Sequence, residues 1–367
     1  MNRIPLSVPD MRGNETAYLQ QCVETNWVSS VGSFVTDLED AIAAYSGAAR
    51  GVAIVNGTCA LELALRVAGV GRDDIVIIPD WTFVATPNAV CHAGAKPHFV
   101  DVSAKTWTMD PDLLEQAIGE AKGRVAAIVP VHALGHPADM DPILAIADRH
   151  GIPVVEDAAG ALGSLYKGAQ IGSLRSKATM FSFNGNKLMT CGSGGMIVTD
   201  DTGLADHAKA LSSQARRTDA YIHDEVAFNY RMSNVNAAIG LAQFERIDEM
   251  LTRRKAIAEA YRSLLEGSNR LRFMPKMDWA DPNGWLSAVH CASADDAAAL
   301  LADMNAADID ARLFWESLSA QPPFADCGHT LSGVSRELTG RIVTLPCSSS
   351  LDDEGLQRVL NVLENWR

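Results

Sequence analysis

The sequence predicts an α/β fold with a mostly parallel sheet of seven strands, followed by a smaller C-terminal α+β domain. Between about residues 50 and 200, short β-rich runs alternate with helix-length amphipathic stretches, a pattern typical of strands joined by crossover helices. Polar residues directly follow several of these runs, as they do at the ligand-binding edge of such sheets. The chain has 367 residues, which is enough for one large or two medium domains.

The strands are predicted by apolar runs bounded by turn residues. In chain order they are GVAIV (51–55), DIVIIP (74–79), PHFVDV (97–102), VAAIVPV (125–131), IPVVED (152–157), ATMFSF (178–183) and GMIVTD (195–200). Helical patterns lie between them, such as TCALELALRVAGV, which ends at a glycine.

Residues 236–265 predict one long helix or two abutting helices that bridge to the second domain. We therefore expect a large domain over 1–245, with the N-terminal arm included, and a small domain over 246–367. The small domain contains a helical pattern, DDAAALLADMNAADI, and a Pro- and Ser-rich stretch, ESLSAQPPFADCGHT, which we expect to be irregular. It ends in an amphipathic helix, DDEGLQRVLNVLENWR.

Composition excludes several classes of function. Forty-five acidic against 31 basic residues leave a net charge of −14, which disfavours binding to nucleic acid or anionic lipid. No apolar run approaches the roughly 18 residues of a membrane span, and the first residues lack the pattern of a signal peptide, so we expect a cytoplasmic protein. Seven cysteines without a CxxC spacing favour neither a disulfide framework nor a zinc site, and we expect no metal.

Four predicted strand ends carry polar or aromatic groups that could meet a ligand. They are Asn56-Gly57-Thr58-Cys59, Pro79-Asp80-Trp81-Thr82-Phe83, Glu156-Asp157 and Ser182-Phe183-Asn184-Gly185-Asn186-Lys187. Each one also has a plain structural reading, respectively a strand-to-helix turn, core aromatics, a capping acid and a solvated lysine. Neither GxxxxGK[ST] nor GxGxxG follows a strand, which disfavours nucleoside triphosphatases and dinucleotide enzymes.

Taken together, these four ends supply the parts that hold pyridoxal phosphate: a lysine, an acid, a Gly-Thr phosphate loop and an aromatic. Their order and spacing resemble the nucleotide-sugar aminotransferases of the DegT/StrS type, which are fold type I pyridoxal phosphate enzymes. The resemblance covers nearly the whole chain. Its most specific stretches are NWVSSVG (26–32), VNGTCALELAL, PDWTFVATPNAV, HPADMDPI (136–143), VVEDAAGALGS, FSFNGNK and FNYRMSNVNAAIGLAQFE (228–245).

The resemblance implies a role for particular residues. Lys187 matches the lysine that bonds to the cofactor, and Asp157 matches the acid that keeps the pyridine nitrogen protonated. Phe83 matches the aromatic that stacks on the ring, with Trp81 as a second candidate. The remaining implied contacts are Gly57, Thr58, Cys59 and Ser182 to the phosphate, Asn229 to the phosphate from a partner subunit, and Trp27, Ser29, Ser30 and Arg231 to the sugar nucleotide.

The implied activity is amino transfer from L-glutamate to a nucleotide-linked keto sugar by a homodimer with shared active sites. WVSSVG, FSFNGNK and HDEVAFNYRMSN most resemble enzymes that aminate C4 of a 4-keto-6-deoxy sugar on routes to legionaminic acid or bacillosamine-like sugars. The alternatives are a 3-keto-sugar aminotransferase and a GDP-4-keto-6-deoxymannose (perosamine-type) aminotransferase. Some relatives carry histidine in place of the lysine and act as dehydratases, which Lys187 argues against.

The chain departs from the family pattern at four places. Relatives commonly carry a polar residue where this chain has Gly160, the loop 172–176 is altered, the loop after the lysine reads GSGG (192–195), and the stretch 275–290 looks shortened. The first two departures motivate a non-enzymatic alternative, a regulatory protein that keeps the cofactor fold without turnover. The last leaves the shape of that part of the pocket open.

Overall fold

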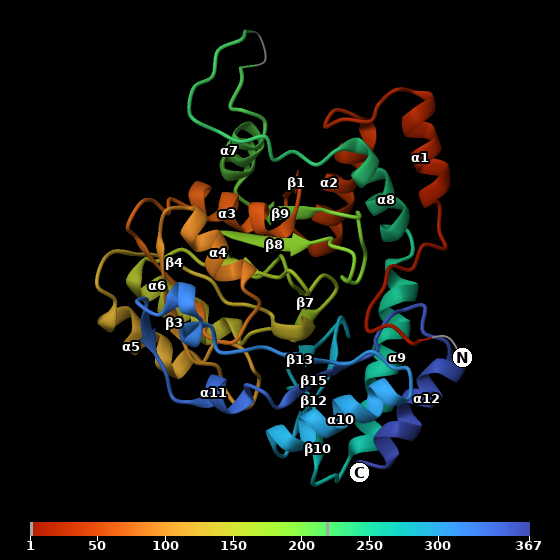
Figure 1. Ribbon diagram of the computed structural model, residues 1–367. Helices are drawn as coiled ribbons and strands as arrows, with labels where there is room; N and C mark the ends of the chain where they lie inside the picture. Colours follow the sequence, from red (N-terminus) through yellow and green to blue (C-terminus); the bar gives the residue numbers. More distant parts are fainter. Residues whose placement is uncertain (1–2, 218–219) are drawn as a thin grey trace.

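A central sheet of eight strands organises the residues that the computed structural model describes, 3–217 and 220–367 (Figure 1). Two four-stranded groups, β1-β9-β8-β5 and β4-β2-β3-β14, are joined by parallel bridges from Ile128 to Val154 and from Val131 to Asp157. Strand β9 is antiparallel to both of its neighbours and the other pairings are parallel. The strands are β1 (Arg50–Ile54), β2 (Ile75–Pro79), β3 (Lys96–Val100), β4 (Val125–Ile128), β5 (Val155–Asp157), β8 (Ala178–Ser182), β9 (Gly195–Thr199) and β14 (Gly328–Thr330).

The predicted α/β class and the mostly parallel sheet are confirmed, since all seven predicted runs are strands of this sheet. The eighth strand, β14, lies in the stretch that we expected to be irregular. Its three residues show no periodicity, and it forms because Asp101, directly after β3, holds the chain that follows it. The Asp101 carboxylate accepts backbone N–H groups from Ser332, Gly333 and Ser335 at 2.6–2.8 Å.

Helices cover both faces of the central sheet, because alternate strand residues point to opposite sides. Ile77, Ile128 and Phe181 belong to one apolar cluster, whereas Val76 and Met180 belong to another. The helices before and between the strands are α1 (Glu15–Glu24), α2 (Ser33–Ser46), α3 (Gly57–Val67), α4 (Ala85–His92), α5 (Pro111–Glu120), α6 (Met140–His150) and α7 (Thr202–Ser212).

A second, antiparallel sheet, in the order β10-β12-β15-β13, lies beside the long helix α9 (Figure 1). It packs against α9, α10 and α12 through an apolar cluster that includes Ile257, Leu300 and Val359. The elements of this part are α8 (Asn234–Phe244), α9 (Ile247–Leu265), β10 (Leu271–Phe273), β12 (Ser287–Cys291), α10 (Ala294–Ala306), β13 (Arg312–Phe314), α11 (Val334–Leu338), β15 (Ile342–Leu345) and α12 (Asp353–Glu364). A small three-stranded sheet consists of β6 (Leu165–Tyr166), β7 (Ala169–Gln170) and β11 (Ala280–Asp281).

The predicted bridge is two helices, α8 and α9, which meet at Glu245 and Arg246. The division into domains at residue 245 stays a prediction. The chain after that point is shared between both sheets, because β14 pairs in parallel with β3. In the part of the chain that the structure describes, no helix is both long enough and apolar enough to cross a bilayer.

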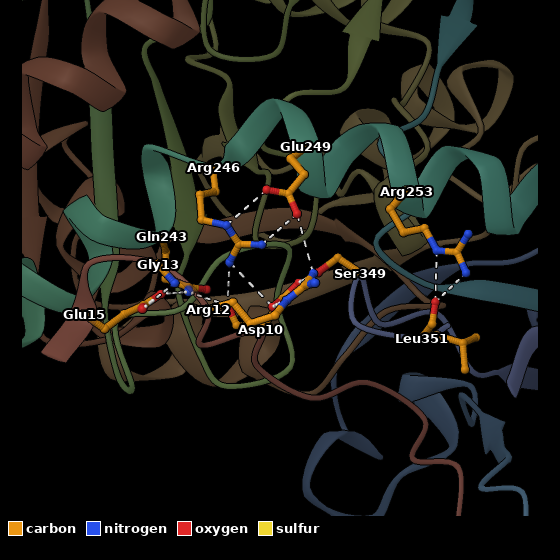
Figure 2. Close-up of polar contacts among 10 residues, drawn as sticks. All are labelled: Asp10, Arg12, Gly13, Glu15, Gln243, Arg246, Glu249, Arg253, Ser349 and Leu351. Atoms are coloured by element: carbon orange, nitrogen blue, oxygen red, sulfur yellow. Dashed lines mark hydrogen bonds and ion pairs between the residues drawn. The ribbon is translucent and has the colours of Figure 1, made fainter. Parts of the chain in front are cut away.

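A polar cluster around Asp10 ties the N-terminal arm to α8, α9 and the segment before α12 (Figure 2). The buried Asp10 carboxylate accepts hydrogen bonds from Arg12 at 2.5 and 2.6 Å and from the Ser349 hydroxyl at 3.0 Å. Gln243 and Arg246 donate to the Asp10 carbonyl at 2.9 and 3.1 Å. These bonds hold together segments that are more than 200 residues apart in the chain.

The Asp10→Asn variant is expected to lower the free energy of unfolding by about 2 kcal/mol at pH 7. The Arg12 hydrogen bonds outweigh burial and lower the pKa of the Asp10 carboxyl to about 2. A lowered folded-state pKa stabilises the protein above the ordinary value near 3.8, and this contribution is lost as the pH falls toward 2. Urea unfolding at pH 7 and below pH 4 measures it, with the exposed Glu364→Gln as control. An equal effect at both pH values would contradict the assignment.

Candidate active site

The carboxyl ends of β1, β2, β5 and β8 meet at one edge of the central sheet, because these strands run in the same direction. All four predicted strand ends therefore share this edge. Ligands of open α/β sheets bind there.

Asp157, the last residue of β5, is buried and its carboxylate is oriented by two donors. The Thr86 hydroxyl donates to Oδ2 at 2.7 Å, and the Ala159 amide donates to Oδ1 at 3.1 Å. No other side chain donates to it among the described residues. The carboxylate therefore keeps acceptor capacity for a further donor.

Glu156 points to the other face of the sheet, where its acceptors are already used. The Thr179 hydroxyl donates to Oε1 at 2.9 Å, and His132 Nε2 lies 2.8 Å from Oε2. The Ala138 amide donates to His132 Nδ1 at 3.0 Å, so the ring proton is on Nε2 and the imidazole donates to Glu156. Of the two adjacent acids, only Asp157 is available to a ligand at this edge.

Lys187 follows β8 and its amine lies against an aromatic face. Nζ is 3.6 Å from the ring centroid of Trp285. Burial lowers the pKa of Lys187 to about 7, although the charge of Asp157 acts in the opposite direction. A substantial fraction of the amine is therefore neutral at neutral pH, as a lysine nucleophile or base requires.

The start of α3 forms a cradle together with the end of β8. Gly57 lies so close to Ser182 that a Cβ at position 57 would be 2.8 Å from the Ser182 Cβ. The first amides of a helix have no intrahelical acceptor and favour an anion. Gly57, Thr58 and the Ser182 hydroxyl therefore fit a phosphate group.

The Cys59 amide is engaged within the first turn of α3, and its predicted contact with a phosphate stays a prediction. Asn56 is the N-cap of α3, and its side chain accepts the Cys59 amide at 2.8 Å. Capping of this kind uses one of the free amides of the first turn. Two backbone donors therefore remain for a phosphate, those of Gly57 and Thr58.

The two aromatics after β2 have different environments. Trp81 is fully buried, and its indole donates to the Trp315 carbonyl at 3.1 Å, so Trp81 is a core residue and not a second stacking candidate. Phe83 is 58% exposed. The Phe83 carbonyl accepts the Thr86 amide at 3.2 Å, which places Phe83 one turn from the residue that orients Asp157. Phe83 therefore remains the candidate for stacking.

Arg231 is engaged by another side chain in the structure, and its predicted contact with a sugar nucleotide stays a prediction. Its guanidinium donates to Glu39 Oε1 at 2.6 Å in a largely buried ion pair. Its backbone bridges to Ile54 in β1, which directs the side chain under α2. The sequence pattern could not distinguish this structural role from binding to an anion.

The other predicted substrate and partner contacts lie on the surface. Asn229 is exposed and bridges to Ser213. The described residues between them, 214–217 and 220–228, form a segment that projects beyond α7 (Figure 1). Trp27 is 54% exposed, and the carbonyls of Trp27 and Ser29 accept from Asn234 at 2.7 and 2.6 Å. No hydrogen bond or ion pair joins Asn229, Trp27, Ser29 or Ser30 to Asp157 or Lys187 among the described residues, so their roles stay predictions.

The structure adds Trp285 to the site, and the sequence did not indicate this residue. It belongs to the stretch 275–290, and its indole packs on Gly160 so closely that a Cβ at position 160 would be 1.9 Å from Trp285 Cε3. Thr86 was also missed. The one sequence feature that could have indicated Trp285 was Gly160, where relatives commonly carry a larger polar residue.

Three features of the structure fit pyridoxal phosphate. The Gly57 cradle has no room for a Cβ, Asp157 keeps free acceptor capacity, and the Lys187 amine has a pKa of about 7. Phosphate, protonated ring nitrogen and aldehyde each have a matching group at the same edge of the sheet. The site therefore has the chemistry to hold this cofactor.

Gly57→Ala is expected to weaken the binding of pyridoxal phosphate about tenfold or more, because the new methyl group would displace Ser182 and overpacking costs about 1–3 kcal/mol. Titration of the cofactor by absorbance measures this. Gly119→Ala in α5 is the matched control, since nothing lies within 4 Å of a Cβ there. Equal affinity of the Gly57 variant and the wild type would contradict the cradle.

Comparisons with known proteins cover the whole chain. The DegT/DnrJ/EryC1/StrS aminotransferase family matches residues 9–364. The pyridoxal phosphate-dependent aminotransferase EpsN of Bacillus subtilis is 37% identical over 98% of this chain and 95% of that protein. A GDP-perosamine synthase of Caulobacter vibrioides is 37% identical over 99% and 98%. The crystal structure of S. venezuelae DesV matches with a TM-score of 0.92 at 30% identity over 100% and 99%.

Proposed function

This chain belongs to the DegT/DnrJ/EryC1/StrS aminotransferase family and is a pyridoxal phosphate-dependent sugar aminotransferase. From that premise we propose that it moves the amino group of L-glutamate to C4 of a nucleotide-linked 4-keto-6-deoxy sugar. The substrate we propose is UDP-2-acetamido-2,6-dideoxy-4-ketohexose, used in surface-glycan or legionaminic acid-type sugar biosynthesis. The observation that carries the chemistry is the Lys187 amine, with its pKa of about 7, at the sheet edge that also carries Asp157.

The cofactor, when bound, supplies an electron sink that stabilises negative charge at the carbon losing a proton. Lys187 Nζ would be the base that removes this proton from Cα of the amino donor and passes it to the cofactor within the same half-reaction, and in the second half it would deliver a proton to the sugar carbon that receives the amine. The Asp157 carboxylate, held by Thr86 and Ala159, accepts a hydrogen bond from a protonated ring nitrogen and keeps that proton in place. The Gly57 and Thr58 amides and the Ser182 hydroxyl hold the phosphate.

A GDP-4-keto-6-deoxymannose (perosamine-type) aminotransferase is the second candidate. It is supported by the names of relatives, since proteins from Caulobacter vibrioides and Escherichia coli O157:H7 that are 37% and 33% identical are called GDP-perosamine synthases. The FSFNGNK and NWVSSVG stretches resemble those of enzymes on routes to legionaminic acid or bacillosamine-like sugars, which supports the first candidate. A 3-keto-sugar aminotransferase differs from both in the carbon that is aminated.

The test is a pair of reactions with the full chain loaded with pyridoxal phosphate. With L-glutamate, the expected result is conversion of the cofactor and release of 2-oxoglutarate. With the UDP- and GDP-linked 4-keto sugars supplied separately, turnover with one of them and NMR of the product identify the nucleotide and the carbon. Turnover of a 3-keto sugar alone would overturn C4 amination, and conversion of neither glutamate nor any keto sugar would favour a regulatory protein.

We also propose that the enzyme is a homodimer in which Asn229 completes the partner's site. Large apolar side chains are exposed on the segment directly before Asn229, with Tyr221 88% and Val226 98% exposed. Exposed apolar groups gathered on one segment are typical of a contact with another chain. This segment projects beyond α7 in Figure 1.

Mixing the inactive variants Lys187→Ala and Asn229→Ala tests the shared site. A mixed dimer has one site with both wild-type residues if Asn229 acts across the interface, so refolding an equal mixture should restore about a quarter of the wild-type activity. No recovery in a mixture whose dimers have exchanged subunits would place Asn229 in the site of its own chain.

A further inference from the structure

Gly160 and Trp285 occupy one another's space. Position 160 lies three residues after Asp157 and carries no side chain, and the six-membered ring of Trp285 fills that volume. A Cβ at position 160 would lie 1.9 Å from Trp285 Cε3 and 2.2 Å from Cζ3. Because two atoms cannot approach this closely, any residue other than glycine at position 160 requires the indole to move.

Hydrogen bonds through its indole N–H and its backbone hold Trp285 in this place. Its indole N–H donates to the Asn186 carbonyl at 2.9 Å, and its amide donates to Asn283 Oδ1 at 2.8 Å. The Asn283 amide group in turn donates to the carbonyls of Gly160 and Leu162 at 2.9 and 2.8 Å. The segment before β12 is therefore clamped onto the loop that follows Asp157.

Arg254 of α9 fixes Trp285 relative to Lys187. Its buried guanidinium donates to the Trp285 carbonyl at 2.8 Å and to the Lys187 carbonyl at 3.2 Å. These bonds join the backbones on either side of the contact between Lys187 Nζ and the indole face. The geometry of this contact is thus set by the fold and not by the lysine side chain alone.

Two charged groups from other elements lie near Lys187. Asp157 of β5 favours the charged amine, and Arg254 of α9 contacts the lysine carbonyl. The indole face also favours an ammonium ion through the ring quadrupole, whereas burial under the ring disfavours it. The pKa of Lys187 lies at about 7, well below the ordinary 10.5, so burial is the dominant effect.

We propose that Trp285 is the positioning residue of Lys187. The Trp285 indole lies in the space that Gly160 leaves empty. Whenever the Lys187 amine is not bonded to the cofactor, this indole holds the amine against its face and shields the amine from water. Glycine at position 160 is then required, because any side chain there would displace the Trp285 indole from the Lys187 amine. The inference rests on the proposed function in one respect, that Lys187 is the reacting lysine.

The test measures the pH dependence of Lys187 acylation in the full chain after removal of the cofactor. Only the neutral amine reacts with acetic anhydride, so mass spectrometry of the Lys187 peptide gives a midpoint, with exposed lysines as internal standards. The midpoint should lie near pH 7 in the wild type. In Trp285→Ala it should rise by about one unit or more, because water then reaches the amine. Trp285→Phe should restore most of the shift.

Trp279→Ala is the matched control, because this indole packs on His136 and Tyr166 and does not contact Lys187. It should leave the midpoint unchanged. An unchanged midpoint in a folded Trp285→Ala, or an equal rise in the Trp279 variant, would overturn the proposal.

A second variant, Gly160→Ala, keeps the proposal testable if Trp285→Ala is poorly folded, and the double variant extends the test where both fold. Gly160→Ala should raise the midpoint by displacing the indole and should lower the unfolding temperature. Adding Trp285→Ala should leave the midpoint where it is and recover part of the unfolding temperature, because the clash is gone. Additive effects on both quantities would overturn the proposal. These measurements need no substrate, so they can support or contradict the role of Trp285 even if the protein transfers no amino group.

Discussion

Replacing Lys187 with alanine is expected to reduce amino transfer by at least about a thousandfold, since a general base alone contributes about 10²–10⁴-fold. The variant loses both the group that bonds to the cofactor and the base that moves the Cα proton. Its phosphate cradle at Gly57 and Ser182 is untouched, so it should still bind pyridoxal phosphate. Absorbance of the bound cofactor and release of 2-oxoglutarate are the two measurements.

Lys177→Ala serves as the control for the loss of a lysine. Lys177 follows the loop 172–176 and pairs with Asp201 on the surface at 2.7 Å, away from the sheet edge that carries Asp157. It should keep the activity of the wild type. A Lys187 variant that still turns over at more than a tenth of the wild-type rate would show that another lysine carries the reaction.

Asp157→Asn is expected to leave the cofactor bound while slowing the half-reaction with glutamate by about a hundredfold or more. An amide does not hold a proton on the ring nitrogen, and loss of one preorganised electrostatic partner costs about 10²–10³-fold in rate. Stopped-flow absorbance of the loaded enzyme mixed with glutamate measures the step. Near-normal rates would mean that Asp157 is the wrong acid.

Thr86→Val provides a graded companion to this variant. It removes the hydroxyl that donates to Asp157 Oδ2 at 2.7 Å and keeps a side chain of similar shape. A hydrogen bond to a charged group contributes about 1.5–3 kcal/mol, so we expect a loss of about tenfold or more, smaller than that of Asp157→Asn. The exposed Asp141→Asn, which loses only a surface pair with Lys167, should behave as the wild type.

The central sheet could be predicted from the sequence because strand formation depends on local patterning. Each of the seven predicted runs is apolar, bounded by turn residues and buried on both faces of the sheet. β14 escaped prediction because it is held by Asp101, a residue more than 220 positions away. Its pairing is a consequence of tertiary contacts and leaves no periodic signal in its own residues.

The environments of individual side chains also depend on tertiary contacts that no local pattern in the sequence records. Trp81 and Phe83 are two residues apart and were both candidates for stacking, yet one is fully buried and the other 58% exposed. From the sequence, the Arg231 guanidinium was a candidate for binding a substrate. In the structure it pairs with Glu39. The Cys59 amide belongs to the phosphate loop by position but is bonded to Asn56.

The sequence by itself determined the class of fold and the seven strand runs, and it placed Lys187 and Asp157 after two of those strands as candidate site residues. It could do so because the ends of parallel strands gather at one edge whatever the rest of the chain does. Only the tertiary structure decided which hydrogen-bond donors are free to meet a ligand. It also decided that Trp285 fills the space at Gly160. Those outcomes depend on atoms brought together from distant segments, where a contact of 3 Å is set by packing that no local pattern records.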